Sequence, residues 1–332
     1  MSTAQRAYQT KILREHVASG GAGLAGDEAL MASADVHTLG AGLVALRGNV
    51  LGLFRFFEHT FLRLARRFRA EERHYPVLLP LQTLEEVGYF SHFPQQVTFG
   101  SHFPEDLPIL EAVARSVAAN KGRLAQEMRE RVEAAHHALK PAVCLPCYGQ
   151  FRGTRLPVDG AVRITMQNHV FRHEGNRYDA LARLWDFQVR DIVFLGSYQE
   201  VKALREEAMD AIMALCEELD LTARLALAND PFFLGESSHK IVYQRLGEVK
   251  YELLLRIPHR EMDVAAASFN LHRDFYASVY DIRQHDGAVA ETACMGFGIE
   301  RWVYGFLSQK GMDPTGWPEQ VAAWVKSYAA GP

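Results

Sequence analysis

The sequence contains few cysteines, no long apolar run and no excess of positive charge. Four cysteines in 332 residues are too few for a disulfide framework, so we expect a reducing, cytoplasmic environment. No stretch is apolar over the length that a bilayer requires, and the polar first residues lack the apolar segment of a signal peptide. The formal net charge of −4 argues against a protein whose main task is to grip nucleic acid by its phosphates.

The remaining composition is typical of a soluble globular protein, with 48% hydrophobic and 23% charged residues. The length allows one large domain or two ordinary ones. Residues 1–35 are mostly small and polar, and they predict an N-terminal extension with a short helix over 5–17 and a flexible link after it. We expect the main domain to span residues 36–332.

Helical periodicity is clearest in two segments. Apolar residues recur every three or four positions over 54–68 and over 201–219, which predicts two amphipathic helices. Residues 110–139 also have a helical pattern, and predict one long helix or a helical pair that Pro141 ends. The helix over 54–68 has a basic outer face, which is either a solvated surface or a dock for an acidic partner; it consists of Arg55, Arg63, Arg66 and Arg67.

Short strands dominate the second half of the chain. We expect early strands at 42–46 and 75–80, with an irregular segment at 87–103. After residue 222 the short apolar runs and turn residues predict consecutive strands, which favours antiparallel pairing. These strands are expected at 223–228, 241–243, 251–257, 265–271 and 289–294, with a helix at 299–307. Helices and strands do not alternate regularly, so the sequence predicts an α+β fold with a large antiparallel sheet flanked by helices.

The stretch 171–196, FRHEGNRYDALARLWDFQVRDIVFLG, is the one around which the chain is organised. Its apolar ends predict two neighbouring antiparallel strands, and its polar middle predicts a long loop between them. The charged residues expected around this loop are Arg172, Glu174, Arg183, Arg190 and Asp191. They could hold an anion, a metal or both, or they could form the surface ion pairs of a solvated hairpin.

A second polar motif, Gly296-Phe297-Gly298-Ile299-Glu300-Arg301, follows a strand and opens a helix. Glycines allow the backbone to approach a ligand closely, and the free N–H groups of a helix N-terminus attract anions. Arg301 adds a planar fork that suits phosphate. The alternative is a helix cap with a surface arginine, and the motif lacks the third glycine of a dinucleotide site.

The cysteines allow three interpretations. Cys144 and Cys147 form a C-L-P-C pair, which is a typical redox motif, although no thioredoxin-like pattern surrounds it. Cys144 and Cys294, with a carboxylate from the 171–196 stretch, could instead supply three zinc ligands and leave one position open. The third possibility is inert core cysteines, which is our interpretation of Cys216 beside the apolar face of 201–219.

Together these segments resemble a known family. FRHE with RDIVFLG resembles motif 2 of class II aminoacyl-tRNA synthetases, GFGIER resembles motif 3, and residues 54–80 resemble motif 1, the usual dimer interface. More closely, the chain from about residue 40 to 310 resembles the amino acid:[carrier protein] ligases, which are similar to the catalytic core of the zinc-dependent seryl-tRNA synthetases of methanogens. The segments that carry this closer resemblance are AVCLPCYG, FRHEG, ANDPFF, KYELL, SFNLHRD and TACMGFGIER.

The resemblance implies a fold, a reaction and partners. It makes residues 36–332 a class II synthetase-like catalytic domain of a homodimer. ATP and a small amino acid would form an aminoacyl-adenylate and pyrophosphate, and the aminoacyl group would pass to the phosphopantetheine thiol of an acyl or peptidyl carrier protein. A tRNA-binding domain is absent, so tRNA is not expected as a partner. The alternatives are aminoacylation of an RNA and an inactive paralogue that acts by binding and regulation.

The resemblance also assigns residue roles. Arg172 and Arg301 are the expected catalytic residues, with Arg172 on the α-phosphate and Arg301 on the γ-phosphate or over the adenine. The expected ATP-binding set is Arg172, Glu174, Arg183, Phe187, Glu300 and Arg301, where Glu174 accepts from the adenine amino group and Phe187 stacks on the ring. Mg²⁺ would accompany ATP, with Asp263 as a candidate outer ligand.

A zinc ion in each subunit would bind the substrate amine at its open position. Cys144 and Cys294 match the two cysteine ligands of the relatives, and Asp191 occupies the position of their glutamate. Aspartate is one methylene shorter than glutamate. The strand could move closer to the ion, or Cys147 or a water could compensate.

Overall fold

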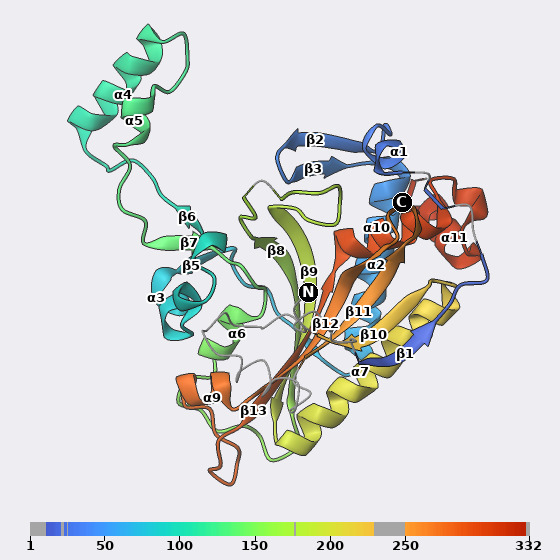
Figure 1. Cartoon of the computed structure of the whole chain (residues 1–332). Coiled ribbons are helices and arrows are strands. Elements are labelled where there is room, and N and C mark those ends of the chain that lie inside the picture. The colour runs from blue at the N-terminus through green and yellow to red at the C-terminus, as the bar shows by residue number, and fades with distance from the viewer. Residues whose placement is uncertain (1–10, 21–22, 25, 176, 229–249, 330–332) are drawn as a thin grey trace, which may run out of the picture.

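The computed structural model describes residues 11–20, 23–24, 26–175, 177–228 and 250–329. Within these ranges the chain forms an eight-stranded sheet with the order β1-β10-β11-β12-β13-β9-β8-β4 (Figure 1). Neighbouring strands pair antiparallel, except for the parallel pair of β4 and β8 at one edge. The strands are β1 Ile12–His16, β4 Glu71–Glu72, β8 Val162–Phe171, β9 Asp186–Gly196, β10 Ala223–Leu227, β11 Lys250–Ile257, β12 Met262–Arg273 and β13 Glu291–Gly298.

Long helices cover one face of this sheet. They are α2 Gly48–Arg67, α7 Tyr198–Glu218 and α10 Ile299–Lys310, and α11 Glu319–Ala329 packs against α2. Helix α7 begins at a capping box, in which Ser197 and Glu200 satisfy each other's free backbone N–H groups. Aromatic side chains join the layers: the ring of Phe61 on α2 stacks on that of Phe297 on β13 with 4.7 Å between centroids. This face therefore forms a dry, apolar core that fixes the sheet.

Among the described residues, the elements on the opposite face of the sheet are short. These are α3 Leu81–Glu86, α6 Leu145–Gly149, α9 Phe275–Tyr280 and the small sheet of β5 Leu78–Pro80, β6 Thr98–Gly100 and β7 His137–Leu139. The rings of Tyr148 on α6 and Tyr276 on α9 stack with 4.0 Å between centroids. In the ranges that the structure describes, these short elements leave cavities beside the sheet, so this face has room for a ligand.

The remaining elements lie around this core. The hairpin of β2 Val36–Gly40 and β3 Leu43–Leu46 follows α1 Asp27–Met31. Helices α4 Leu107–Ala119 and α5 Gln126–Arg129 lie away from the large sheet (Figure 1). The short 3-10 turns are η1 Tyr89–Ser91, η2 Pro94–Gln96, η3 Pro258–Arg260 and η4 Pro314–Gly316. In the described part of the chain, no helix combines the length and the apolarity that crossing a membrane requires.

The α+β prediction with a large antiparallel sheet is confirmed. So are the helices predicted over 54–68, 201–219 and 299–307, which lie within or overlap α2, α7 and α10. The four arginines on the outer face of α2 are exposed, and Cys216 is buried. The strand predicted at 241–243 and most of the ANDPFF motif lie outside the described residues.

Two predictions of local structure are wrong. Residues 12–16, expected in a helix, form β1, because they pair with β10 at the sheet edge. Of the two forms predicted over 110–139, the single long helix is wrong and the helical pair is closer: α4 ends at Ala119, where Asn120 and the left-handed residues Lys121 and Gly122 turn the chain, and the short α5 follows. Residues 137–139 then form β7, which pairs with both β5 and β6. Long-range pairing outweighs local helical preference in both places.

Candidate active site

The face of the sheet opposite the long helices presents a row of polar side chains. Successive residues of a strand point to opposite faces, so alternate positions share one face. The alternate residues on this face line a cavity of about 170 Å³, and they come from four adjacent strands. They are Phe187, Val189 and Asp191 on β9, Cys294, Gly296 and Gly298 on β13, Ser268 and Asn270 on β12, and Lys250 and Glu252 on β11.

Three arginines predicted from two motifs converge beside this cavity. Arg172, Arg183 and Arg301 all line an adjoining cavity of about 660 Å³. The Nε of Arg172 donates to the carbonyl of Pro141 at 2.9 Å, and Arg301 donates to the carbonyls of Ala182 and Ala265 at 2.8 and 2.9 Å. Neither bond of Arg301 uses Nη2, the second terminal nitrogen of its guanidinium group. The structure thus brings Arg172 and Arg301 together on one space, as predicted.

The electrostatics of this cavity favour an anion. Burial, followed by the positive charge of Arg172, lowers the pKa of Arg301 to about 10. The guanidinium remains protonated at neutral pH. Keeping this charge buried beside Arg172 costs free energy, and a bound anion would reduce that cost. A polyanion such as a triphosphate is the class of ligand that matches several convergent guanidinium groups.

A small recess beside these arginines contains the rest of the expected nucleotide set. Glu174, Phe187 and Glu300 line it together with Arg172 and Arg301. The guanidinium carbon of Arg172 lies 5.6 Å from the ring centroid of Phe187. The carboxylate of Glu174 accepts from Gln96 at 3.5 Å and lies 4.0 Å from Arg177. All six residues of the expected set therefore border one connected space.

Glu300 has a further, structural role. Both of its carboxylate oxygens accept from the backbone N–H of Gln188 at 3.0 Å, which ties α10 to β9. Burial raises the pKa of Glu300 to about 7, and the hydrogen bonds from the backbone only partly oppose this shift. Its side chain is thus engaged with the protein before any nucleotide arrives.

The expected metal ligands meet at the floor of the smaller cavity. One ligand atom each from Cys144, Asp191 and Cys294 lies within 4.8 Å of the other two, and all three residues are buried. Cys144 precedes α6, and the other two lie on the neighbouring strands β9 and β13. A Cβ atom at position 296 would lie 2.9 Å from a carboxylate oxygen of Asp191. Glycine at this position avoids that steric clash with the Asp191 side chain.

The donor set fits a zinc ion. Two sulfurs and one carboxylate oxygen are ligands that zinc prefers, and small shifts would bring them to the roughly 3.8 Å separation of a tetrahedral site. A hydrogen bond from Cys144 to Cys294 raises the pKa of the first thiol and lowers that of the second, and burial raises the pKa of Asp191. Three groups that would each be anionic in a dry space need a cation to ionise together.

Neighbouring polar side chains contact the sulfur of Cys294 and orient it. The amide of Asn270 and the Nε2 of His272 each lie 3.5 Å from the Sγ of Cys294. His272 in turn contacts the hydroxyls of Thr292 and Tyr148, at 3.1 and 3.5 Å through Nδ1. Such outer contacts orient metal ligands and tune their charge.

Two expectations about individual residues need correction, and a third, Asp263, stays a prediction. Arg190 does not face the 172–185 loop: it is 2% exposed on the opposite face and pairs with Glu58 and Glu72 at 2.7 and 3.1 Å. The reason is strand alternation, since its neighbour Asp191 faces the cavity. Cys147 is buried in the apolar cluster and is not part of the three-ligand group. Asp263 borders the larger cavity, but its two oxygens pair with Arg224 and Arg256 at 3.0 and 3.4 Å.

Sequence reasoning missed several residues of the site. Lys250 and Glu252 form an ion pair of 2.7 Å on the cavity wall, and their alternation with apolar residues on β11 was the available signal. Lys140 is fully buried, and its Nζ has no hydrogen-bond partner among the described residues. Burial lowers the pKa of Lys140 to about 8, against the charge of Asp191. A lone lysine between apolar residues was the signal there.

Comparison of the whole fold identifies the class. The structure superposes on the seryl-tRNA synthetase of M. kandleri, solved with a tRNASec of A. aeolicus, with a TM-score of 0.84 and 22% identity over 97% of this chain and 64% of that one. The fold is that of a class II aminoacyl-tRNA synthetase, with a mainly antiparallel sheet flanked by helices.

Sequence comparison narrows the class to a family. The chain is 31% identical to amino acid–[acyl-carrier-protein] ligase 1 of Bradyrhizobium diazoefficiens over 76% of this chain and 75% of the relative. It is 26% identical to the type-2 serine–tRNA ligase of Methanococcus aeolicus over 81% of this chain, and it spans about half (53%) of that relative. The chain belongs to the family of amino acid–[acyl-carrier-protein] ligases, homologues of the type-2 serine–tRNA ligases. No protein-family model matches it.

Proposed function

We propose that the protein activates a small amino acid with ATP and transfers it to the phosphopantetheine thiol of a carrier protein. The observation that carries the proposal is the meeting of Arg172 and Arg301 on one cavity, with Cys144, Asp191 and Cys294 at the floor of the adjoining space. A triphosphate site and an amine site are thereby neighbours. The two relatives named as amino acid–[acyl-carrier-protein] ligases, each 31% identical, support the choice of acceptor.

In the first step a carboxylate oxygen of the amino acid attacks the α-phosphorus of ATP and pyrophosphate leaves. Arg172 would hold the α-phosphate and stabilise the charge that develops on it. Arg183 and Arg301 hold the outer phosphates, and Mg²⁺ enters with ATP. Phe187 stacks on the adenine, and the carboxylate of Glu174 accepts from its amino group. The chain thus acts mainly by positioning and by charge stabilisation.

The three metal ligands orient the amino acid. Cys144, Asp191 and Cys294 would hold a zinc ion whose open position binds the substrate amine. The cavity above them has a volume of about 170 Å³, which suits a small side chain. Because the amine is fixed at one end and the phosphates at the other, the carboxylate lies between them. This geometry favours in-line attack on the α-phosphorus.

In the second step the carrier-protein thiolate attacks the carbonyl carbon of the adenylate and AMP leaves. The product is a thioester on the pantetheine arm. We also propose that the protein acts as a homodimer through the face that includes α2, as the motif 1 resemblance implies, and that it is cytoplasmic. We retain residues 36–332 as the catalytic domain, with β1 and α1 contributing to it.

The test is amino-acid-dependent exchange of pyrophosphate into ATP with zinc-loaded protein across a panel of amino acids. We expect exchange with one or a few small amino acids, and its loss in Arg172→Met with retention in Arg283→Met. Arg283 also pairs with an aspartate, at 2.7 Å from Asp281, but borders neither cavity. Absence of exchange with every amino acid would end the proposal.

A second assay decides the acceptor. The charged enzyme is offered a pantetheinylated carrier protein, the same protein without its arm, and tRNA. We expect label only on the first. Label on tRNA instead would favour the activity that the serine–tRNA ligase relatives bear in their names. Tight binding of ATP with neither exchange nor transfer would favour an inactive, regulatory paralogue.

A further inference from the structure

A tight turn presents Arg183 to the larger cavity. In this turn, residues 179–183, the carbonyl of Asp179 accepts from the N–H groups of Ala182 and Arg183 at 2.9 and 3.0 Å, and the N–H of Asp179 donates back to Arg183. Ala180 has a φ of 40°, a left-handed conformation that costs a non-glycine residue free energy. Such a turn persists only where surrounding contacts hold it.

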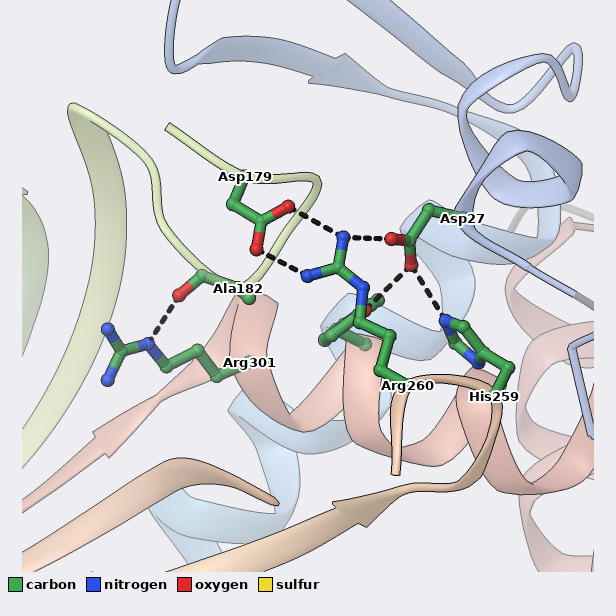
Figure 2. A network of polar contacts seen from close by, with 7 residues as sticks. Asp27, Asp179, Ala182, His259, Arg260 and Arg301 are labelled. Carbon is green, nitrogen blue, oxygen red and sulfur yellow. Dashed lines mark hydrogen bonds and ion pairs between the residues drawn. The ribbon is translucent and has the colours of Figure 1, made fainter. Parts of the chain in front are cut away.

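Arg260 supplies a forked side-chain contact to this turn. It lies at the end of η3, some eighty residues further along the chain, and its guanidinium faces the carboxylate of Asp179 fork to fork (Figure 2). The distance from Nη2 to Oδ1 is 2.7 Å. Asp27, at the start of α1, contacts the same Nη2. One arginine therefore bridges the N-terminal segment and the 172–185 loop.

Asp27 is itself fixed from two other sides. His259 Nε2 lies 2.9 Å from its Oδ1, and the hydroxyl of Tyr304 donates to the same oxygen at 2.7 Å. Burial raises the pKa of Asp27, but the hydrogen bonds from Tyr304, His259 and Arg260 outweigh it and lower the pKa overall. The aspartate is thus a charged acceptor built into the fold, with 20% of its side chain exposed.

The helix that carries Arg301 joins the two ends of this network. Tyr304 lies three positions after Arg301 on α10, so the two side chains share one side of the helix. Arg301 donates to the carbonyl of Ala182, inside the 179–183 turn (Figure 2). Release of the turn would therefore displace Arg183 and also remove an acceptor that orients Arg301.

We propose that Arg260 is a positioning residue for ATP: by clamping Asp179 to Asp27 it sets the 179–183 turn and through it Arg183 and Arg301. An ordinary surface ion pair contributes little. This one is a forked, partly buried contact, with Arg260 25% exposed, and it restrains a strained turn. The inference rests on the proposed function, because it assigns Arg183 and Arg301 to the phosphates of ATP.

The test compares Arg260→Met, Arg260→Lys and Asp27→Asn with the full-length, zinc-loaded protein. For Arg260→Met we expect the KM for ATP and the calorimetric Kd for ATP to rise about tenfold, since misplaced binding groups weaken phosphate contacts. The KM for the amino acid should stay within about twofold, since that substrate binds at the metal end. The lysine variant, which keeps one charge without the fork, and Asp27→Asn should lie between wild type and Arg260→Met.

A double-mutant cycle separates positioning from mere destabilisation. If Arg260 acts through the turn, Arg260→Met should add less than about twofold to the ATP defect of Arg183→Met, because coupled residues are not additive. Arg283→Met serves as the matched control, since it breaks an arginine–aspartate pair that lines neither cavity, and should leave the ATP parameters unchanged.

The outcomes distinguish the two proposals. Wild-type protein that binds ATP without exchange would overturn the proposed function, while the calorimetric comparison would still decide the role of Arg260. An unchanged Kd for ATP in Arg260→Met would overturn the positioning role, as would a full, multiplicative loss in the double variant. Equal losses for ATP and the amino acid would point to general destabilisation, which likewise contradicts it.

Discussion

The two ends of the proposed active site, which we assign to the metal and to the phosphates of ATP, are built differently. At the metal end, Cys144, Asp191 and Cys294 are 4–5% exposed, and two of them lie on adjacent strands in the middle of the sheet. At the phosphate end, Arg172 and Arg183 belong to the 172–185 loop, and hydrogen bonds to backbone carbonyls and the Arg260 clamp position the arginines. Strand register fixes the first end, and loop contacts fix the second. Substitutions should therefore act in an all-or-none way at the metal end and by degrees at the phosphate end.

The largest effect is expected at the metal end. Cys294→Ser removes one of the three proposed zinc ligands, and we expect the zinc affinity to fall at least about a hundredfold. Zinc content after dialysis, measured by mass spectrometry, and pyrophosphate exchange should be lost together. Cys147→Ser is the matched control, because Cys147 is equally buried and lies outside the ligand group.

The same pair of variants tests the redox alternative. A C-L-P-C dithiol enzyme would lose activity in Cys147→Ser and keep it in Cys294→Ser. If Cys294→Ser retained zinc, the zinc site would not depend on all three ligands that strand register brings together. The two ends would then not differ in how they respond to substitution.

At the phosphate end we expect Arg172→Met to lower kcat/KM for ATP-dependent exchange by about a thousandfold, because the forked donor to the α-phosphate is lost. Zinc content should remain that of the wild type. Arg172→Lys should recover only part of the loss, since a point charge does not reproduce the fork. A loss of zinc in Arg172→Met would mean that the two ends are not independent.

The smallest effect concerns Glu300, which ties α10 to β9 beside the phosphate end. Its pKa is about 7 in the folded protein against 4.5 ordinarily. Between about pH 4.5 and 7, Glu300 is therefore mostly protonated in the native state and mostly ionised in the unfolded state. Stability contributed by the protonated form is present below about pH 4.5 and is lost as the pH rises through 7. The wild type should lose stability relative to Glu300→Gln across this window, by at most about 1.4 kcal/mol per pH unit.

Urea unfolding of both proteins at several pH values between 5 and 8 measures this difference. Glu127→Gln, at an exposed position on α5, is the control and should follow the wild-type profile. Parallel curves for the wild type and Glu300→Gln would show that Glu300 does not carry the extra proton, and that the backbone hydrogen bonds from Gln188 prevail over burial.

Much of the fold could be predicted because apolar periodicity reports burial directly. The helices over 54–68 and 201–219 and most strands after residue 222 have clear periods, and packing confirms them. The predictions failed where pairing partners are distant: residues 12–16 and 137–139 become strands only because β10, β5 and β6 lie beside them. Local preference contains no information about such neighbours.

The sequence by itself determined which residue types are available to the candidate site, since the arginines, glycines and cysteines occur at fixed places in the motifs. Tertiary structure decided which of them share a space. It placed Cys144 beside Cys294, turned Arg190 to the face opposite Asp191, and joined Asp27 to Asp179 through Arg260. The physical reason is that side-chain identity is local, whereas strand register and loop anchoring arise only when segments far apart in sequence pack together.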